Sequence, residues 1–377
     1  MPNPNLSSKI VPSFSSFFAD LKDPRRTAKG NHLYPLEEIL FLCIAAVISG
    51  ADTWTSINLF GNSKLDWLKK WYPYENGIPS HDVLGKVFAA VDPDAFSKCF
   101  TSWIGSIANT VPQEIIAIDG KTICRSDDKG KGKSAIHVVS AFASENGICL
   151  GQLAVDSKSN EITAIPELLE LLAIKGCTVT IDAMGCQKNI AKTIVKKEAD
   201  YILMVKGNQK GLNDQIKKMF KMNQVVSEDM DSDIGHGRIE HRKCEVINKL
   251  DFMDDRQEWP GLKSVIRITS ERISKQTGKE TSETRYYISS LDADARSINK
   301  AVRSHWSVEN KLHWVLDVVF KEDASLKKKD NSAMNYNIIA KMALTMIDKE
   351  KSTKKSKPSK RLLAALDDNY RAKILKV

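Results

Sequence analysis

The sequence of 377 residues lacks the cysteine patterns that build metal ribbons or secreted disulfide frameworks. Its seven cysteines are scattered, and no two of them form a CxxC pair, so we interpret them as reduced thiols in a cytoplasm. It also lacks a signal-peptide pattern at its start. The longest apolar run, residues 36–48, is too short to span a bilayer. We therefore expect a cytoplasmic protein with no role in a membrane.

The sequence has fewer acidic than basic residues. The chain has 56 lysines and arginines against 47 acidic residues, and its formal net charge is +9. A basic surface attracts polyanions, of which nucleic acid is the commonest in a cell. A modest positive balance also serves solubility alone, so charge indicates DNA only together with other signals. The apolar content of 42% is enough for two or three domains.

The first 110 residues are predicted to form a helical domain. Apolar residues recur at helical spacing from 12 to 103, and residues 36–48 are apolar nearly all round, which is typical of a buried helix. Ser80 is placed to cap a helix with an apolar face. A helix, a turn and a second helix is also how some proteins read the major groove. DNA binding and a plain helical domain both remain open.

Residues 111–348 are predicted to form a mixed α/β sheet with the strand order of ribonuclease H. Five short apolar runs occur at 114–119, 135–144, 148–156, 177–182 and 200–206, with helical stretches after the third, fourth and fifth. Helical periodicity is lost at about 226–290, where runs typical of strands predict a β-rich insertion. Helices return up to 348. Residues 349–377 are predicted to be a basic tail, with a mobile linker before a short amphipathic stretch.

Three carboxylates in this region suggest a metal site. Asp119 and Asp182 each end an apolar run, and open α/β sheets place their sites at the carboxyl ends of strands. Either aspartate alone also fits a turn or a helix cap. A later helix carries Glu309, and clustered carboxylates need a cation to stay ionised together. Oxygen ligands of this kind favour Mg²⁺, or Mn²⁺.

Two histidines accompany the glutamate. His305, Glu309 and His313 fall at steps of four and share a helical face, which also fits a zinc site. Three ligands from one straight helix seldom surround a metal, and no HExxH motif is present. We therefore favour Glu309 as the ligand, with the histidines packing or positioning phosphate. Trp306 and Leu312 are expected to hold this helix against the sheet.

The motifs IDGK, TIDAMGCQ, KGNQ and HWSVENKLHWVLDVVFKED occur in this order. Together they resemble bacterial insertion-sequence transposases of the ISAs type, which include the H-repeat-associated proteins, and the resemblance runs through almost the whole chain. It implies a DDE transposase with a ribonuclease-H-like core and an associated N-terminal helical domain. It also implies metal-dependent cutting and transfer of the element's own DNA ends by Asp119, Asp182 and Glu309, a homodimer on double-stranded DNA, and association with the nucleoid.

The chain departs from the pattern of related transposases at three positions. Those proteins often carry Tyr, Arg and Lys where this chain has Val302, His305 and Leu316, and Arg303 is near but out of register. The loop 126–133 is glycine-rich and is a candidate to close on DNA. Basic and polar residues near the core are candidates for phosphate contacts: Lys121, Arg125, Lys158, Lys206, Asn208, Gln209, Arg238, Arg242, Arg303 and Lys311.

Two other functions fit the same residues. A nuclease of similar fold would cleave strands without joining them. A catalytically inactive DNA-binding remnant or regulator would keep the fold alone. The presence of all three carboxylates and the uninterrupted motifs favour an active transposase that uses a two-metal phosphoryl transfer.

Overall fold

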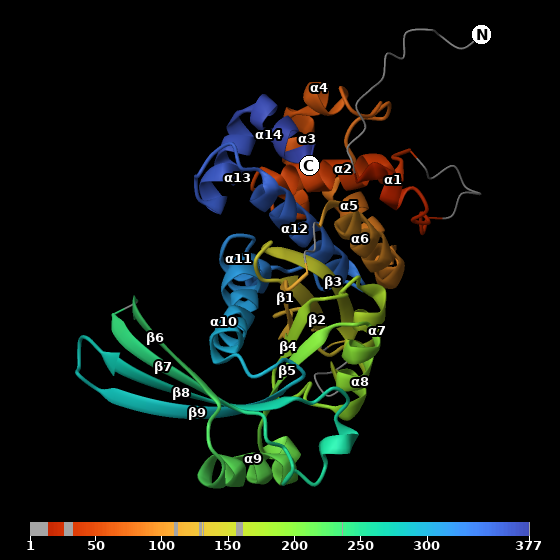
Figure 1. The fold of residues 1–377 in the computed structure, drawn as a ribbon. Coiled ribbons are helices and arrows are strands. Elements are labelled where there is room, and N and C mark those ends of the chain that lie inside the picture. The colour runs from red at the N-terminus through yellow and green to blue at the C-terminus, as the bar shows by residue number, and fades with distance from the viewer. Residues whose placement is uncertain are drawn as a thin grey trace.

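The computed structural model describes residues 14–25, 33–108, 112–127, 130, 132–155, 161–235 and 237–376. A central sheet lies between a helical region and a long arm of β-strands (Figure 1). No helix in the part of the chain so described is both long and apolar enough to cross a membrane.

Five strands form the core of the sheet in the order β3-β2-β1-β4-β5. The first three pair antiparallel, while β4 and β5 run parallel to β1. This is the predicted strand order of ribonuclease H, which is therefore confirmed. The strands are apolar runs because helices cover both faces. Their bounds are β1 Ile115–Thr122, β2 His137–Ala143, β3 Ile148–Val155, β4 Thr178–Ile181 and β5 Asp200–Val205.

Different helices cover the two faces of this sheet. Helix α7 (Glu161–Leu171) and helix α8 (Lys188–Lys196) pack on one face. Helix α10 (Ala295–His305) packs on the other, where Ile115, Ile202 and Met204 meet its apolar side. Alternate strand residues therefore enter different cores, as the period of two in a strand requires. The chain continues from α10 into the π-helical segment η6 (Val308–His313) and helix α11 (Trp314–Val318).

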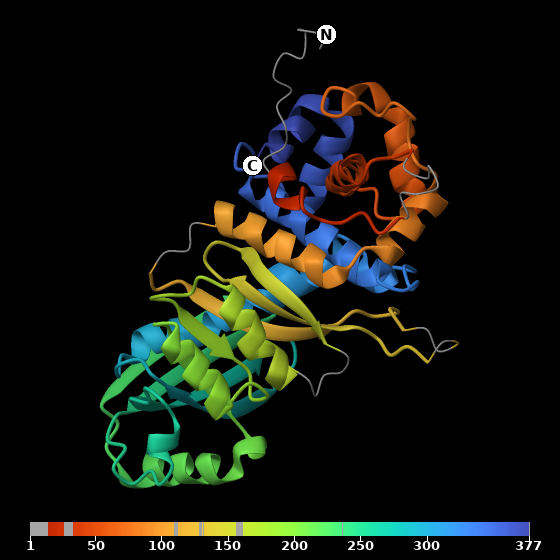
Figure 2. The same ribbon diagram turned by 90° about the vertical axis from the view of Figure 1, so that its right-hand side faces the viewer.

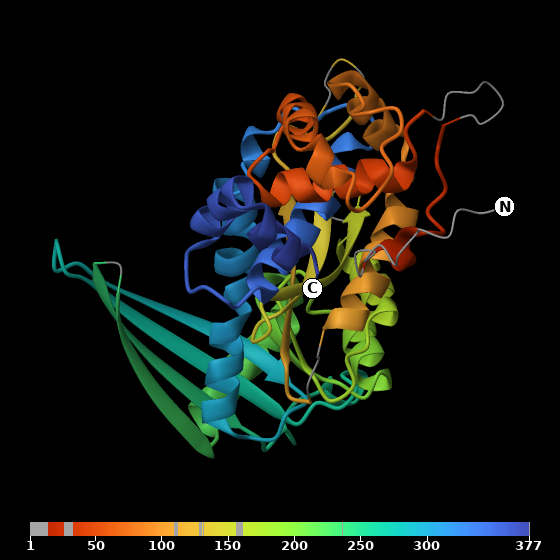
Figure 3. The same cartoon turned by 90° about the horizontal axis from the view of Figure 1, so that it is seen from above.

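The arm extends the same sheet, because β9 pairs antiparallel with β5. Its strands follow in the order β9-β8-β7-β6 and project away from the core (Figure 3). The predicted β-rich insertion is confirmed, although β6 was not expected because its sequence SEDMDSDIG is acidic and almost entirely exposed. Helix α9 (Lys210–Met222) precedes the arm, whose strands are β6 Ser227–Gly235, β7 Arg238–Ile247, β8 Ser264–Ser274 and β9 Glu280–Ser289.

The helical region is built from both ends of the chain (Figure 2). Helix α12 (Ser332–Lys349) packs against α2, α5 and α6, and it also contacts the sheet at β3. Helix α2 is buried along its length, as its apolar sequence predicts. The N-terminal helices are α1 Ser15–Phe18, α2 Leu36–Ile48, α3 Trp54–Ser63, α4 Leu65–Leu68, α5 His81–Ala90 and α6 Pro93–Ile107.

The last part of the chain forms packed helices, where the sequence predicted a short amphipathic stretch after a linker. Helices α13 (Lys357–Leu366) and α14 (Asp368–Leu375) pack against α2 and α12. Arg361 is buried because its guanidinium pairs with Asp52 and donates to backbone carbonyl groups. A basic side chain whose donors all find such partners can be buried, and charge along the sequence does not show this.

Candidate functional site

Asp119 and Asp182 come from neighbouring strands. In the parallel register of β1 and β4, Ile118 pairs with Ile181, so the next residue of each strand is an aspartate. Asp119 still lies within β1, whereas Asp182 directly follows β4. The sheet therefore brings the two aspartates together at one edge of two parallel strands, where α/β folds place their sites.

Glu309 lies on an unusual helical segment that packs against the sheet. The run from Val308 to His313 is a π-helix, in which the Trp314 N–H donates to the carbonyl oxygen of Glu309. Val308 and Leu312 are buried, and the segment contacts β1. Single π-turns inside α-helices often occur at functional sites, since they change which residues share a face.

One of the two packing expectations for this helix fails. Leu312 packs as expected, but Trp306 is 41% exposed. Its ring lies beneath the guanidinium of Arg285, at 5.1 Å from the ring centroid, instead of in the core. Trp306 directly follows α10 and precedes the π-helical segment, and its apolar ring alone does not show which way it faces.

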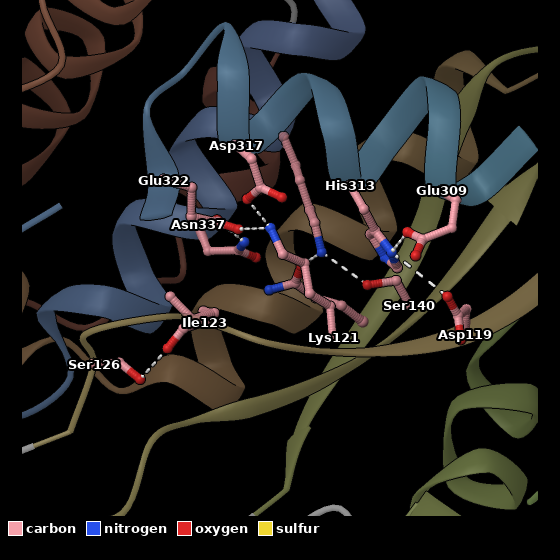
Figure 4. Close-up of polar contacts among 12 residues, drawn as sticks. Asp119, Lys121, Ile123, Ser126, Ser140, Glu309, His313, Asp317, Glu322 and Asn337 are labelled. Atoms are coloured by element: carbon pink, nitrogen blue, oxygen red, sulfur yellow. Dashed lines mark hydrogen bonds and ion pairs between the residues drawn. The ribbon is translucent and has the colours of Figure 1, made fainter. Parts of the chain in front are cut away.

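His313 joins Asp119 and Glu309 (Figure 4). Its Nδ1 atom lies 3.0 Å from Oε2 of Glu309 and 3.5 Å from Oδ2 of Asp119. One potential ligand atom from each of these three residues lies within 4.8 Å of the others, the only such group found in the described part of the chain. The sequence suggested His313 only as a neighbour of the glutamate, because the spacing of four residues does not show which strand the helix faces.

His305 does not belong to this group. Its Nδ1 atom lies 3.0 Å from the hydroxyl oxygen of Thr180 on β4. Burial lowers the pKa of His305, while the Asp182 charge opposes this shift. The zinc arrangement with His305, Glu309 and His313 around one ion is therefore absent among the described residues.

The carboxylates are short of positive charge. Burial, together with the nearby charges of Glu309 and Asp182, raises the pKa of Asp119 to about 6, while His313 opposes the shift. The pKa of Glu309 is lowered, chiefly by its hydrogen bond with His313. Buried His313 Nε2 has no hydrogen-bond partner among the described residues. Repelling carboxylates beside a buried imidazole fit a divalent cation, which removes the repulsion.

The loop after Asp182 is fixed by hydrogen bonds. Oδ1 of Asp182 accepts from the backbone N–H of Met184 at 3.0 Å. Asn208 donates to the carbonyl oxygen of Ala183 at 2.6 Å, and Gln209 donates to that of Cys186 at 2.9 Å. Two amide side chains that were expected to contact DNA are thus bonded to the loop that follows Asp182.

Lys121 also has protein partners. It follows Asp119 by two residues on β1, and its ammonium pairs with Asp317 and, at 2.8 Å, with Glu322 (Figure 4). These side chains are 16%, 25% and 4% exposed, respectively. The IDGK motif therefore carries one side chain toward the carboxylate group and another into a separate ion-pair cluster.

The other predicted DNA contacts are spread over the molecule. Arg125, Lys206 and Lys311 are exposed, and Lys311 donates to the carbonyl oxygen of Ser144 at 3.1 Å. Arg303 on α10 pairs with Asp231 at 3.0 Å and with Asp233, both on β6. In the arm, Arg238 is exposed and Arg242 is buried, and Lys158 lies outside the described residues.

The fold and site define a ribonuclease-H-like protein with an acidic, cation-poor centre. The Transposase DDE domain family matches residues 111–346, and the DDE_Tnp_1-associated family matches residues 15–104. The chain therefore belongs to the DDE transposases, as its motifs indicated.

Relatives with similar sequences carry transposase names. YncI of Escherichia coli O157:H7, named as a candidate transposase, is 45% identical over 97% of this chain and 95% of its own length. YhhI of Escherichia coli strain K12, named as a candidate H repeat-associated transposase, is 42% identical over 94% of this chain and 95% of its own length. A solved piggyBac transposase synaptic complex with hairpin DNA has a TM-score of 0.46 at 11% identity, covering 97% of this chain and 81% of that one, and this likeness is too weak to support an argument.

Proposed function

We propose that this transposase cleaves DNA at the ends of its own insertion sequence and joins the released strands to a target, with Asp119, Asp182 and Glu309 as its metal-binding residues. The observation that carries the proposal is the register of β1 and β4, which sets two aspartates side by side, with a helical glutamate facing the first. The transposase names of the full-length relatives support the same activity.

The three carboxylates would hold Mg²⁺ or Mn²⁺, which favour oxygen ligands. When bound, two such ions activate a water or a 3′-hydroxyl and stabilise the leaving 3′-oxygen of a phosphodiester. The aspartates supply two ligands from a rigid sheet edge, and Glu309 supplies one from the helix. The Nδ1–H of His313 donates to Glu309 and keeps its carboxylate turned toward Asp119.

Positive side chains around this centre would hold the DNA backbone. Arg125 and Lys206 are exposed and follow the core strands β1 and β5, and Lys311 is exposed two residues after Glu309. Such contacts give an affinity that falls steeply with salt. Because an insertion sequence has two ends, we propose that two copies of the chain act together on DNA, close to the nucleoid.

The test uses a labelled duplex with the ends of the protein's own element, incubated with Mg²⁺ or with EDTA. We expect cleavage at the element end in Mg²⁺ only, and its loss in Asp182→Asn and Glu309→Gln. A second, unlabelled plasmid serves as target, and joined product is expected when the donor carries a free 3′-hydroxyl.

Three other outcomes would contradict parts of this proposal. Cleavage without joined product at any target concentration would identify a nuclease. Binding without cleavage in both Mg²⁺ and Mn²⁺ would identify an inactive DNA-binding remnant. Cleavage at the wild-type rate by Asp182→Asn would show that the assigned aspartate is wrong.

A further inference from the structure

Strand β1 and the helical segment after Glu309 touch at two successive levels. At the first, Asp119 meets His313 and lies in the group that includes Glu309. At the second, Lys121 meets Asp317 on α11. Side chains two residues apart on a strand share a face, and residues 309, 313 and 317 are spaced by four along the helical segment. The same strand face thus contacts the same side of the helix twice.

The second level is a group of paired charges. The ammonium of Lys121 lies between the carboxylates of Asp317 and Glu322. Burial opposes protonation of Lys121, but Glu322 and Asp317 outweigh it and raise the lysine pKa. Glu322 also accepts from Asn337 on α12, and the buried Lys341 lies close enough to influence this group. The ammonium of Lys121 therefore bridges two carboxylates, one of which Asn337 also holds.

The chain adopts a costly backbone conformation to place Glu322. Lys321, directly before it, has φ of 55°, in the left-handed region that non-glycine residues seldom adopt. Such a conformation persists only where surrounding contacts compensate for it, and here Lys121 and Asn337 both bind the following glutamate. The position of Glu322 is thus determined by partners on β1 and α12.

The geometry points to Lys121 as a positioning residue. With Asp317 and Glu322 it clamps β1 to the segment that follows Glu309, and so sets the separation of the Asp119 and Glu309 carboxylates. This role takes the place of the phosphate contact expected from the sequence, because the ammonium already has two anionic partners and the Lys121 side chain is only 16% exposed. The inference rests on the proposed metal site, which the clamp holds in shape.

The test measures Mn²⁺ binding, DNA binding and cleavage separately. Mn²⁺ alone is titrated into the full chain, and the free ion is followed by electron paramagnetic resonance. We expect Lys121→Met to weaken Mn²⁺ affinity about 10- to 100-fold, the usual loss when a group that orients a ligand is removed. Lys121→Arg should recover part of that loss. DNA affinity in EDTA, and its dependence on salt, should stay at wild-type values.

Matched variants separate this role from a phosphate contact. Lys206→Met should weaken DNA binding and make its logarithmic salt slope shallower by about one. Lys175→Met removes an exposed ion pair with Glu198, whose side chains are 75% and 67% exposed, and should change nothing. If Lys121→Met behaves like Lys206→Met and binds Mn²⁺ normally, the clamp is disproved.

Two further variants keep the result interpretable. If Lys121→Met does not fold by circular dichroism, Asp317→Asn breaks the contact with α11 while Lys121 keeps Glu322, and unchanged Mn²⁺ affinity in it would overturn the inference. Glu309→Gln tests the metal site itself. Normal Mn²⁺ binding by Glu309→Gln would refute the proposed site, whereas its loss together with normal binding by Lys121→Met would refute the clamp alone.

Discussion

Two charged clusters lie two residues apart along β1, and they differ in balance. The first joins Asp119 and Glu309 to one imidazole, with the charge of Asp182 nearby, and burial with mutual repulsion raises the pKa of Asp119 to about 6. The second joins Asp317 and Glu322 to Lys121, whose pKa is raised. The first, the acidic cluster, has no ammonium or guanidinium partner among the described residues and stays ready for a metal ion. The second, called the balanced cluster because the ammonium of Lys121 pairs with both of its acids, is complete without one. Under the proposed function, similar residues would serve metal binding at one level and rigidity at the next.

We expect the largest effect from replacing an aspartate of the acidic cluster, measured against the replacement of an aspartate of the balanced cluster. Asp119→Asn removes a ligand of the acidic cluster, and we expect cleavage to fall about 1,000-fold or more, the scale of losing one preorganised electrostatic group. Asp317→Asn leaves Lys121 paired with Glu322, so we expect a loss of only about tenfold. Single-turnover cleavage at saturating Mg²⁺ and DNA measures both. Equal losses of cleavage in the two variants would mean that both clusters contribute to the reaction in the same way.

The sequence predicts the frame of the acidic cluster well. Apolar runs that end in aspartate located Asp119 and Asp182 on neighbouring strands, and the motif around Glu309 placed it on a facing helix. These signals are local, because the length of each apolar run and its last residue determine which side chain stands at the end of a strand. The β-rich insertion was visible for the same reason.

The balanced cluster could not be predicted in this way. The partners of Lys121 lie 196 and 201 residues away in sequence, and nothing local distinguishes this lysine from one that binds phosphate. The π-helical segment that carries Glu309 and His313 has no periodic signal in the sequence, and neither has the outward position of Trp306. The burial of Arg361 depends on Asp52 in the N-terminal region. Pairing between distant segments decides all of these cases.

Lys327 is a second lysine whose surroundings can be compared with those of Lys121. It is buried, it contacts the rings of Tyr336 and Trp54, and its nearest acid, Asp52, is shared with Arg361. Burial outweighs Asp52 and lowers the lysine pKa to about 8, opposite to the shift at Lys121. A cation without its own carboxylate is thus held less firmly in its charged form.

A pH titration of stability tests this difference. The unfolded chain binds a proton on Lys327 up to an ordinary pKa of 10.5, but the folded chain loses it near 8. Stability relative to Lys327→Met should therefore be lowest below pH 8 and rise by up to about 3 kcal/mol toward pH 10.5. Urea unfolding of both proteins at pH 7.5 and 10 measures the change. A difference that is constant with pH would show that Lys327 keeps its proton throughout.

Mn²⁺ should stabilise the protein through the acidic cluster only. At about 100 times its dissociation constant, an ion that binds the folded chain alone adds about 2.7 kcal/mol. We expect this increase in the wild type and its absence in Asp119→Asn, as measured by urea unfolding with Mn²⁺ or EDTA. Glu322→Gln, an acid of the balanced cluster, should keep most of the increase. Full stabilisation of Asp119→Asn would place the ion elsewhere.

His313 should have the smallest effect, because it acts on Glu309 through a hydrogen bond. Its Nδ1 lies 3.0 Å from Oε2 of Glu309 and the side chain is 5% exposed, so the imidazole can hold that carboxylate toward Asp119. His313→Ala removes the donor, and we expect Mn²⁺ affinity to fall about 10- to 100-fold. His313→Asn places an amide N–H near the position of Nδ1 and should restore part of the affinity, whereas His313→Leu should not. If His313→Asn and His313→Leu bind Mn²⁺ equally weakly, the imidazole nitrogen is itself a metal ligand and the site has four ligands.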